Sequence, residues 1–143
     1  MARQHIPKPI RRQVVQRANE CCEYCLIHQD DRPESHQIDH ILALKHGGSD
    51  ELDNFALACA VCNHHKGTDF YAIDPLEQTA APLFNPRTQS WNEHFQLAGV
   101  EIIGLTPTGR ATAWLLRFNE EERLIERQEL IEVGRYPLQP RST

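Results

Sequence analysis

Two pairs of cysteines constrain this chain more than any other feature of its sequence. In each pair two residues separate the cysteines, as Cys22-Glu23-Tyr24-Cys25 and as Cys59-Ala60-Val61-Cys62. A tight turn with this spacing can present two thiolates to one ion, and a structural zinc ion takes four ligands in a tetrahedron. We therefore predict that one zinc ion joins two turns that are distant in the sequence. The alternative is that these residues are ordinary buried cysteines or a disulfide pair.

Cys21 is the fifth cysteine of the chain. We expect it to behave as a small apolar residue, although a register in which it replaces Cys22 as a zinc ligand stays open. Cysteines that bind zinc suit a reducing compartment.

The segment between the cysteine pairs is long enough to need structure of its own. Residues 36–44 have the composition of a strand, 45–50 that of a Gly-rich loop, and 51–58 that of a second short strand. The residues that follow Cys62 are expected to start a helix. Asp39 and His40 would point to opposite faces of a regular strand, whereas a bulge or a strand end would let both address one site.

Taken together, these residues resemble the HNH endonucleases, a family with a ββα-metal (His-Me finger) fold. The resemblance covers about residues 20–70 and includes the following positions: Cys22, Cys25, Asp39-His40-Ile41, Gly47-Gly48, Asn54, Leu57, Cys59, Cys62-Asn63 and Lys66-Gly67. The third letter of the family name stands for a histidine, and this chain has Asn63 there, a substitution common in the family. His64 or His65 in that role is an alternative that the sequence leaves open.

The resemblance implies a role for each candidate of the active site. It implies that His40 is the general base, that Asp39 and Asn63 bind one catalytic Mg²⁺ or Mn²⁺ ion, and that Asn54 orients His40 and fixes the loop. The chemistry is consistent, because imidazole titrates near neutral pH and oxygen donors suit hard divalent ions. Taken singly, a histidine on a strand is usually structural, and asparagines such as Asn54 and Asn63 are often turn or cap residues.

The first 19 residues are basic, with no acidic side chain before Glu20. Residues 10–19 have apolar side chains at helical spacing, so we expect an extended arm followed by a helix. We predict contacts with nucleic acid for four basic side chains: Arg11, Arg12, Arg17 and Lys66. A solvated charged face is the alternative, and the net charge of −5 counts mildly against indiscriminate nucleic-acid binding.

The C-terminal half has weaker signals. Residues 71–90 are expected to form a surface linker that Leu83 and Phe84 anchor to the core. A hairpin is predicted from strands at 91–97 and 100–105, followed by a helix that begins at Thr106-Pro107. A capping box formed by Asn119 and Glu122 is expected to open a last helix. Its inward residues are predicted to be Leu124, Ile125, Gln128 and Ile131. The stretch 83–119 resembles the tail of small bacterial HNH proteins, a resemblance that assigns it no role.

We therefore predict one compact α+β domain with a ββα-metal core that a four-cysteine zinc site closes. Its parts are a basic arm and helix (1–19), a nuclease core (20–72), and a linker with a C-terminal hairpin and helices (73–143). The expected function is metal-dependent cleavage of DNA by one divalent ion and a histidine base. A non-catalytic zinc-ribbon module that binds nucleic acid is the alternative, and a protein-binding zinc domain is a third hypothesis.

Partners other than DNA are less well defined by the sequence. A homodimer or a larger nuclease complex stays open. The chain has no apolar run of signal-peptide or membrane-spanning length, so we expect no membrane association and a cytoplasmic protein.

Overall fold

The computed structural model describes residues 6–138, so the first five residues of the predicted basic arm, Arg3 included, lie outside it. The fold is mixed α and β, as predicted. Its α-helices are α1 (Lys8–Arg17), α2 (Ala60–Lys66), α3 (Trp91–His94), α4 (Pro107–Leu115) and α5 (Glu121–Glu132). Its strands are β1 (Gln37–His40), β2 (Phe55–Ala58), β3 (Tyr71–Ile73), β4 (Ala80–Pro82), β5 (Phe95–Ala98) and β6 (Glu101–Gly104).

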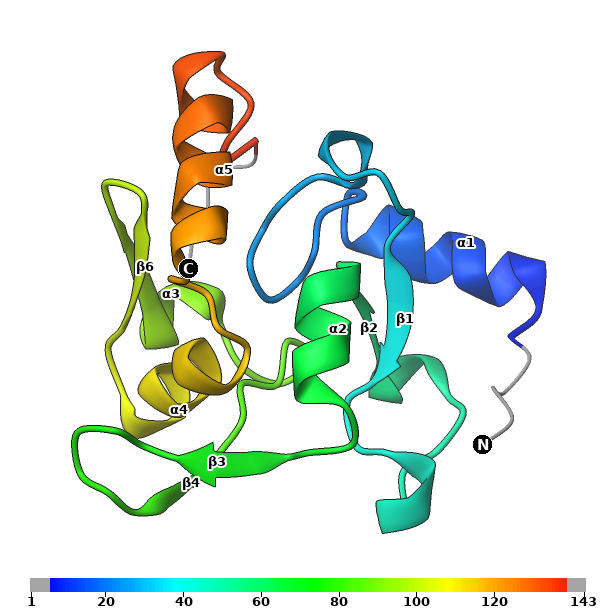
Figure 1. The fold of residues 1–143 in the computed structure, drawn as a ribbon. Coiled ribbons are helices and arrows are strands. Elements are labelled where there is room, and N and C mark those ends of the chain that lie inside the picture. The colour runs from blue at the N-terminus through cyan, green and yellow to red at the C-terminus, as the bar shows by residue number, and fades with distance from the viewer. Residues whose placement is uncertain (1–5, 139–143) are drawn as a thin grey trace.

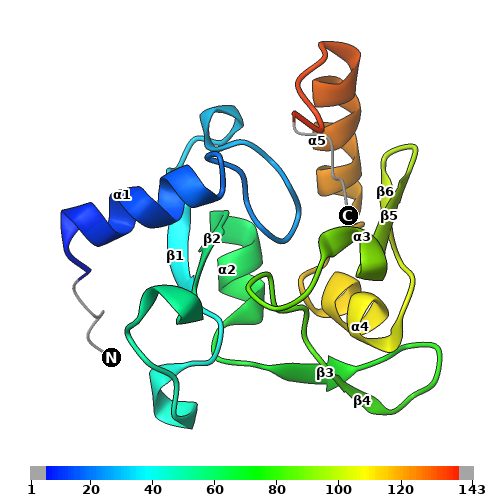
Figure 2. The same cartoon turned by 180° about the vertical axis from the view of Figure 1, so that it is seen from behind.

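The strands pair in sequence order into two-stranded antiparallel sheets, β1 with β2, β3 with β4, and β5 with β6. Helix α2 lies at the centre of the molecule, with α1 and β1–β2 on one side and α3, α4 and β5–β6 on the other (Figures 1 and 2). The β3–β4 hairpin extends from the end of α2 and lies against α4 (Figure 1). The ββα unit expected from the sequence is therefore β1, β2 and α2.

Helix α1 covers the β1–β2 hairpin. Its buried residues Val14 and Ala18 pack with Phe55 and Leu57 of β2 in a small apolar cluster. Burying these side chains stabilises the hairpin, because a two-stranded sheet alone is marginal in water. The predicted N-terminal helix is thus confirmed, and it begins two residues earlier than its apolar spacing suggested, at Lys8 after Pro7.

Helix α2 begins earlier than predicted. Cys59 is its N-cap, and the Cys59 Sγ accepts a hydrogen bond from the Cys62 backbone at 3.4 Å. Asn63 consequently lies inside the helix, which excludes the alternative that it is an N-cap. The helix ends at Lys66, because Gly67 has φ +53 and turns the chain toward β3.

The predicted surface linker contains the β3–β4 hairpin, which sequence patterning missed. Its anchors are confirmed, since Leu83 and Phe84 are both buried. The expected strand at 91–97 was wrong in its first half, where Trp91–His94 form one helical turn before β5. Trp91 of this turn and Phe95, the first residue of β5, are both buried, and the indole nitrogen of Trp91 donates to the Tyr24 carbonyl at 2.8 Å.

The start of α4 follows the prediction. Thr106 is the N-cap, and its hydroxyl accepts a hydrogen bond from the Gly109 backbone at 3.0 Å. The capping box predicted for α5 is wrong, because Glu120 is the N-cap of that helix. The Asn119 side chain instead bonds both backbone groups of Ile102, at 2.9 Å each.

The inward face predicted for α5 is also wrong. Ile125 and Ile131 are exposed, and the residues that α5 buries are Arg123 and Arg127. Both arginines find buried acceptors, which is the condition for placing a guanidinium in a protein interior. Arg127 donates to the carbonyl of Phe118 and Arg123 to that of Leu116.

Within residues 6–138, none of the helices is both long and apolar enough to cross a membrane.

Candidate active site and metal centre

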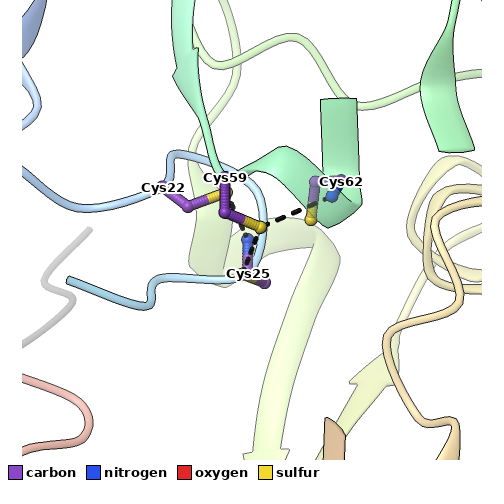
Figure 3. Close-up of side chains that lie close together, drawn as sticks. All are labelled: Cys22, Cys25, Cys59 and Cys62. Atoms are coloured by element: carbon purple, nitrogen blue, oxygen red, sulfur yellow. Dashed lines mark hydrogen bonds between the residues drawn. The ribbon is translucent and has the colours of Figure 1, made fainter. Parts of the chain in front are cut away.

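The four cysteines of the two pairs come together as predicted. Cys22 and Cys25 lie in the turn after α1, and Cys59 and Cys62 at the start of α2 (Figure 3). All four are buried, and their sulfur atoms lie within 4.8 Å of one another. None of them forms a disulfide.

The sulfur spacing fits zinc. A tetrahedron with Zn–S bonds of about 2.3 Å has sulfur atoms about 3.8 Å apart, and Cys25 Sγ lies 3.7 Å from Cys59 Sγ. A disulfide would need about 2.05 Å. The geometry therefore supports the structural zinc site over the disulfide alternative. The cluster contains Cys22 rather than Cys21, whose backbone forms an isolated β-bridge with His28.

Backbone and arginine donors surround the sulfur atoms. The Cys25 backbone donates to Cys22 Sγ at 3.4 Å, which repeats the contact between Cys62 and Cys59. Arg123 of α5 donates to Cys62 Sγ at 3.2 Å and lies 3.9 Å from Cys59 Sγ. Hydrogen bonds to ligand sulfurs stabilise the thiolate form that zinc requires.

The thiols of the cluster differ in acidity. Burial raises the pKa of Cys22 and of Cys62, whereas hydrogen bonds from the other three thiols lower the pKa of Cys25. Burial lowers the pKa of Arg123, but the nearby thiolates outweigh it and raise the pKa overall. Arg123 therefore stays a cation beside the sulfur atoms of the cluster.

Asp39 lies in the interior of the ββα unit. Its side chain is 3 % exposed, and its two oxygens accept hydrogen bonds from the Tyr24 hydroxyl at 2.7 Å and from Lys66 Nζ at 3.2 Å. Burial raises the pKa of Asp39, and the charge of Lys66 acts in the opposite direction. The Lys66 ammonium also donates to the carbonyls of His40 and Ile41, so three acceptors surround it.

His40 is the last residue of β1 and has a different environment. Its Nε2 lies 2.8 Å from Oδ1 of Asp50, and its side chain is 18 % exposed. The imidazole edge packs on the Phe55 ring with centroids 5.1 Å apart. The β1–β2 register is regular from Gln37 to His40, so the structure has no bulge that would turn Asp39 and His40 to one face.

Asn54 fixes the loop between the two strands. Its side chain bonds both backbone groups of Leu42 at 2.9 Å and donates to the Ser49 carbonyl at 2.8 Å. Gly48 packs beneath it, where a Cβ atom would lie 1.7 Å from the Leu42 carbonyl oxygen. Asn54 thus holds the loop that carries Asp50, and Asp50 rather than Asn54 contacts the imidazole of His40.

Asn63 faces β1 from α2, where its amide nitrogen donates to the Gln37 side chain.

The basic residues predicted to contact nucleic acid differ in exposure. Arg12 and Arg17 are exposed and Arg11 is half-buried. Arg11 donates to the His36 carbonyl, and Arg17 donates to the carbonyls of Leu52 and Phe55. The bonds from Arg11 and Arg17 attach α1 to the β1–β2 unit.

Lys66, the fourth basic residue predicted to contact nucleic acid, is internal in this structure. Its side chain is 2 % exposed, and its ammonium is held by Asp39 and by the carbonyls of His40 and Ile41. A contact between Lys66 and a phosphate requires the pair with Asp39 to open first.

Three residues that contact the site were missed from the sequence. Asp50 lies in a Gly-rich loop, and its contact with His40 depends on the conformation of that loop, which the sequence does not give. Tyr24 lies between two cysteines, and its hydrogen bond to Asp39 was not predicted, although a buried tyrosine hydroxyl usually has a hydrogen-bond partner. Arg123 had no sequence signal, because it lies in a charged helix 61 residues from Cys62.

Comparison with known proteins agrees with this geometry. Residues 22–69 match the family model of the HNH endonuclease. The match begins at the first of the four clustered cysteines and includes β1, β2 and α2. Searches of curated proteins and of solved structures give no match.

Proposed function

We propose that this protein is a metal-dependent DNA endonuclease in which His40 is the general base for phosphodiester hydrolysis. The observation that carries the proposal is the His40–Asp50 pair at the end of β1, inside a ββα unit closed by four cysteines. A module that only binds nucleic acid has no need of a histidine held by a carboxylate at this position.

The pair suits proton transfer from water. In the tautomer in which Nε2 donates to Asp50, the lone pair that accepts a proton lies on Nδ1. Asp50 also stabilises the imidazolium that forms. The side chain of His40 is partly exposed, so water and a phosphodiester can reach it. A positioned base of this kind contributes about 10²–10⁴-fold to a rate.

Asp39 and Asn63 are the proposed ligands of a divalent ion. Carboxylate and amide oxygens are the donors that Mg²⁺ and Mn²⁺ prefer, and such an ion would stabilise charge on the phosphorane and on the leaving oxygen. Both oxygens of Asp39 are already bonded in this structure, one of them to Lys66. An ion at Asp39 therefore has to replace the Lys66 ammonium, and that exchange would free Lys66 for a phosphate.

DNA is the proposed substrate, and α1 is a candidate surface for its backbone. Arg12 is exposed on this helix, and Arg11 and Arg17 lie beside it. Clustered arginines bind phosphates with a strong dependence on salt. The alternative is a zinc-ribbon module that binds nucleic acid without cleaving it, which would use the same surface but not His40.

Nicking of supercoiled plasmid tests the proposal. The wild type, His40→Ala and the control His46→Ala are compared with Mg²⁺, with Mn²⁺ and with EDTA, and the zinc content of each protein is measured alongside. His46 is an exposed histidine of the same loop. We expect metal-dependent nicking by the wild type and by His46→Ala, and a loss of at least about 100-fold in His40→Ala.

Two results would contradict the proposal. Zinc-loaded wild type that binds plasmid but does not nick it would favour the binding module. Equal nicking by the wild type and by zinc-loaded His40→Ala would remove His40 from the reaction.

A further inference from the structure

A groove of about 620 Å³ lies on the other side of α2, between that helix, β6 and α4. We call it the Trp114 groove. Its apolar wall includes Ile103, Ala113 and Trp114. Trp114 is 60 % exposed, whereas Ala111 and Thr112 of the same helix are fully buried. An exposed indole beside a groove is a feature that needs an explanation, because large aromatic side chains are usually mostly buried.

Two arginines border the same groove. Arg110 and Arg117 line it together with the carboxylate of Glu120 and with His65, whose pKa is lowered by burial. Arg110 is committed to Asp74, with two hydrogen bonds of 2.9 and 2.8 Å. Arg117 lies 3.5 Å from Glu120, but both side chains are more than half exposed, so this pair is weak and screened by salt. An anionic ligand can therefore replace Glu120 as the partner of the Arg117 guanidinium.

The backbone at Arg117 is unusual. It has φ +56 at the end of α4, a left-handed position that glycine normally occupies. Hydrogen bonds from Arg117 to Trp114 and from Phe118 to Ala113 close the helix there.

We infer that the Trp114 groove binds an unpaired nucleotide of a single-stranded DNA segment. The base stacks on the indole of Trp114, and the Arg117 guanidinium contacts the adjoining phosphate. Aromatic stacking accepts any base because each has a π face, and one guanidinium supplies the phosphate contact. His65 of the groove lies two residues after Asn63 on α2, so the groove borders the helix that carries a proposed metal ligand.

This inference rests on the proposed function and refines it. It specifies a substrate with a single-stranded or locally unpaired segment, in preference to a fully paired duplex. The competing occupant is a second copy of this chain seated on the same apolar wall, and the experiment below separates the two.

Tryptophan fluorescence provides a direct test. The chain has two tryptophans, and the other, Trp91, is buried. Full-length zinc-loaded protein is titrated with an oligothymidylate of about twelve nucleotides, without divalent ions, so that no cleavage occurs. We expect quenching in the wild type and none in Trp114→Phe, which reports Trp91 alone. Affinity measured by anisotropy should fall about tenfold in Trp114→Ala.

Two further variants make the test specific. Arg117→Ala should reduce the slope of log affinity against log salt by about 0.7, the value for one phosphate contact on a single strand. Ile125→Ala is the matched control, since Ile125 is an exposed apolar residue of α5 that does not line the groove. Its affinity should equal that of the wild type.

Unchanged affinity in Trp114→Ala, or equal quenching in the wild type and Trp114→Phe, would overturn the inference. A wild-type dimer that Trp114→Ala converts to a monomer without loss of DNA affinity would assign the groove to a second copy instead. The assay is independent of cleavage. Nicking without a Trp114 response removes only this inference, and a Trp114 response without nicking removes only the nuclease.

Discussion

The guanidinium of Arg123 donates to the sulfur of Cys62 at 3.2 Å, which joins the C-terminal helix directly to the four-cysteine cluster. The same guanidinium donates to the Leu116 carbonyl at 2.7 Å and lies over the Phe118 ring. On the other side of the cluster, the Tyr136 hydroxyl donates to the Cys25 carbonyl at 2.6 Å. The C-terminal segment therefore closes the four-cysteine cluster from two directions and packs against the ββα unit.

Arg123→Ala should accelerate zinc loss. It removes a buried, charge-assisted hydrogen bond to a thiolate, a type of interaction worth about 1.5–3 kcal/mol. The measurement is the rate of zinc transfer to a chromogenic chelator, with zinc-loaded protein at neutral pH. Arg117→Ala is the control, because Arg117 is an exposed arginine close by that does not contact a cysteine. Equal release rates in the two variants would show that Arg123 does not support the site.

Lys66→Met should destabilise the protein strongly. The variant leaves the Asp39 carboxylate buried without its cation, and breaking a buried pair in this way costs about 3–5 kcal/mol. Asp39→Asn added to Lys66→Met should restore part of the loss, because the uncompensated charge is then gone. Urea unfolding of the two single variants and the double variant forms a cycle. Strictly additive losses would mean that the two side chains are not coupled.

Gly48→Ala should disrupt the loop that positions His40 and Asp50. The added Cβ would lie 1.7 Å from the Leu42 carbonyl oxygen and 2.9 Å from the Asn54 amide nitrogen. Gly99→Ala is the matched control, since Gly99 has φ +64 but open space around its Cβ position, and should cost about 1 kcal/mol. We expect Gly48→Ala to lose more stability than this and to lose nicking as well. Full activity in Gly48→Ala would refute the close packing of the loop.

Asp74 should stabilise the fold in a pH-dependent way. Hydrogen bonds from Arg110 lower its pKa to about 2, below the value of about 3.9 of an unfolded chain. Its contribution is thus present in full above the unfolded pKa and is lost as pH falls toward about 2. The stability difference between wild type and Asp74→Asn should shrink from pH 7 to pH 3 in urea unfolding. Zinc loss in acid affects both proteins, so the difference isolates Asp74, and a constant difference would argue against the pair.

The cysteine cluster and the ββα unit were predictable because short-range spacing encodes them. Two CxxC turns and a strand that ends in Asp39-His40 need no knowledge of distant contacts. The arginine face of α5 was not predictable in the same way. Periodicity arguments place apolar residues inward, yet here Arg123 and Arg127 find carbonyl and thiolate acceptors that only the tertiary fold brings within reach.

The partner of His40 was missed for a related reason. From the sequence we predicted that Asn54 orients His40. In the structure Asn54 holds the loop, and Asp50 on that loop contacts the imidazole of His40. Which loop residue meets the end of β1 depends on the three hydrogen bonds of Asn54, and spacing alone does not contain that information.

We propose that Asp50 acts through His40 in proton transfer. A cycle of wild type, Asp50→Asn, His40→Ala and the double variant, measured as single-turnover nicking rates of zinc-loaded proteins, tests it most directly. We predict that Asp50→Asn slows the wild type by about 10- to 100-fold, within the range expected of base catalysis, and has no further effect once His40 is alanine. Equal slowing by Asp50→Asn in both backgrounds would contradict the account, because Asp50 would then act independently of His40.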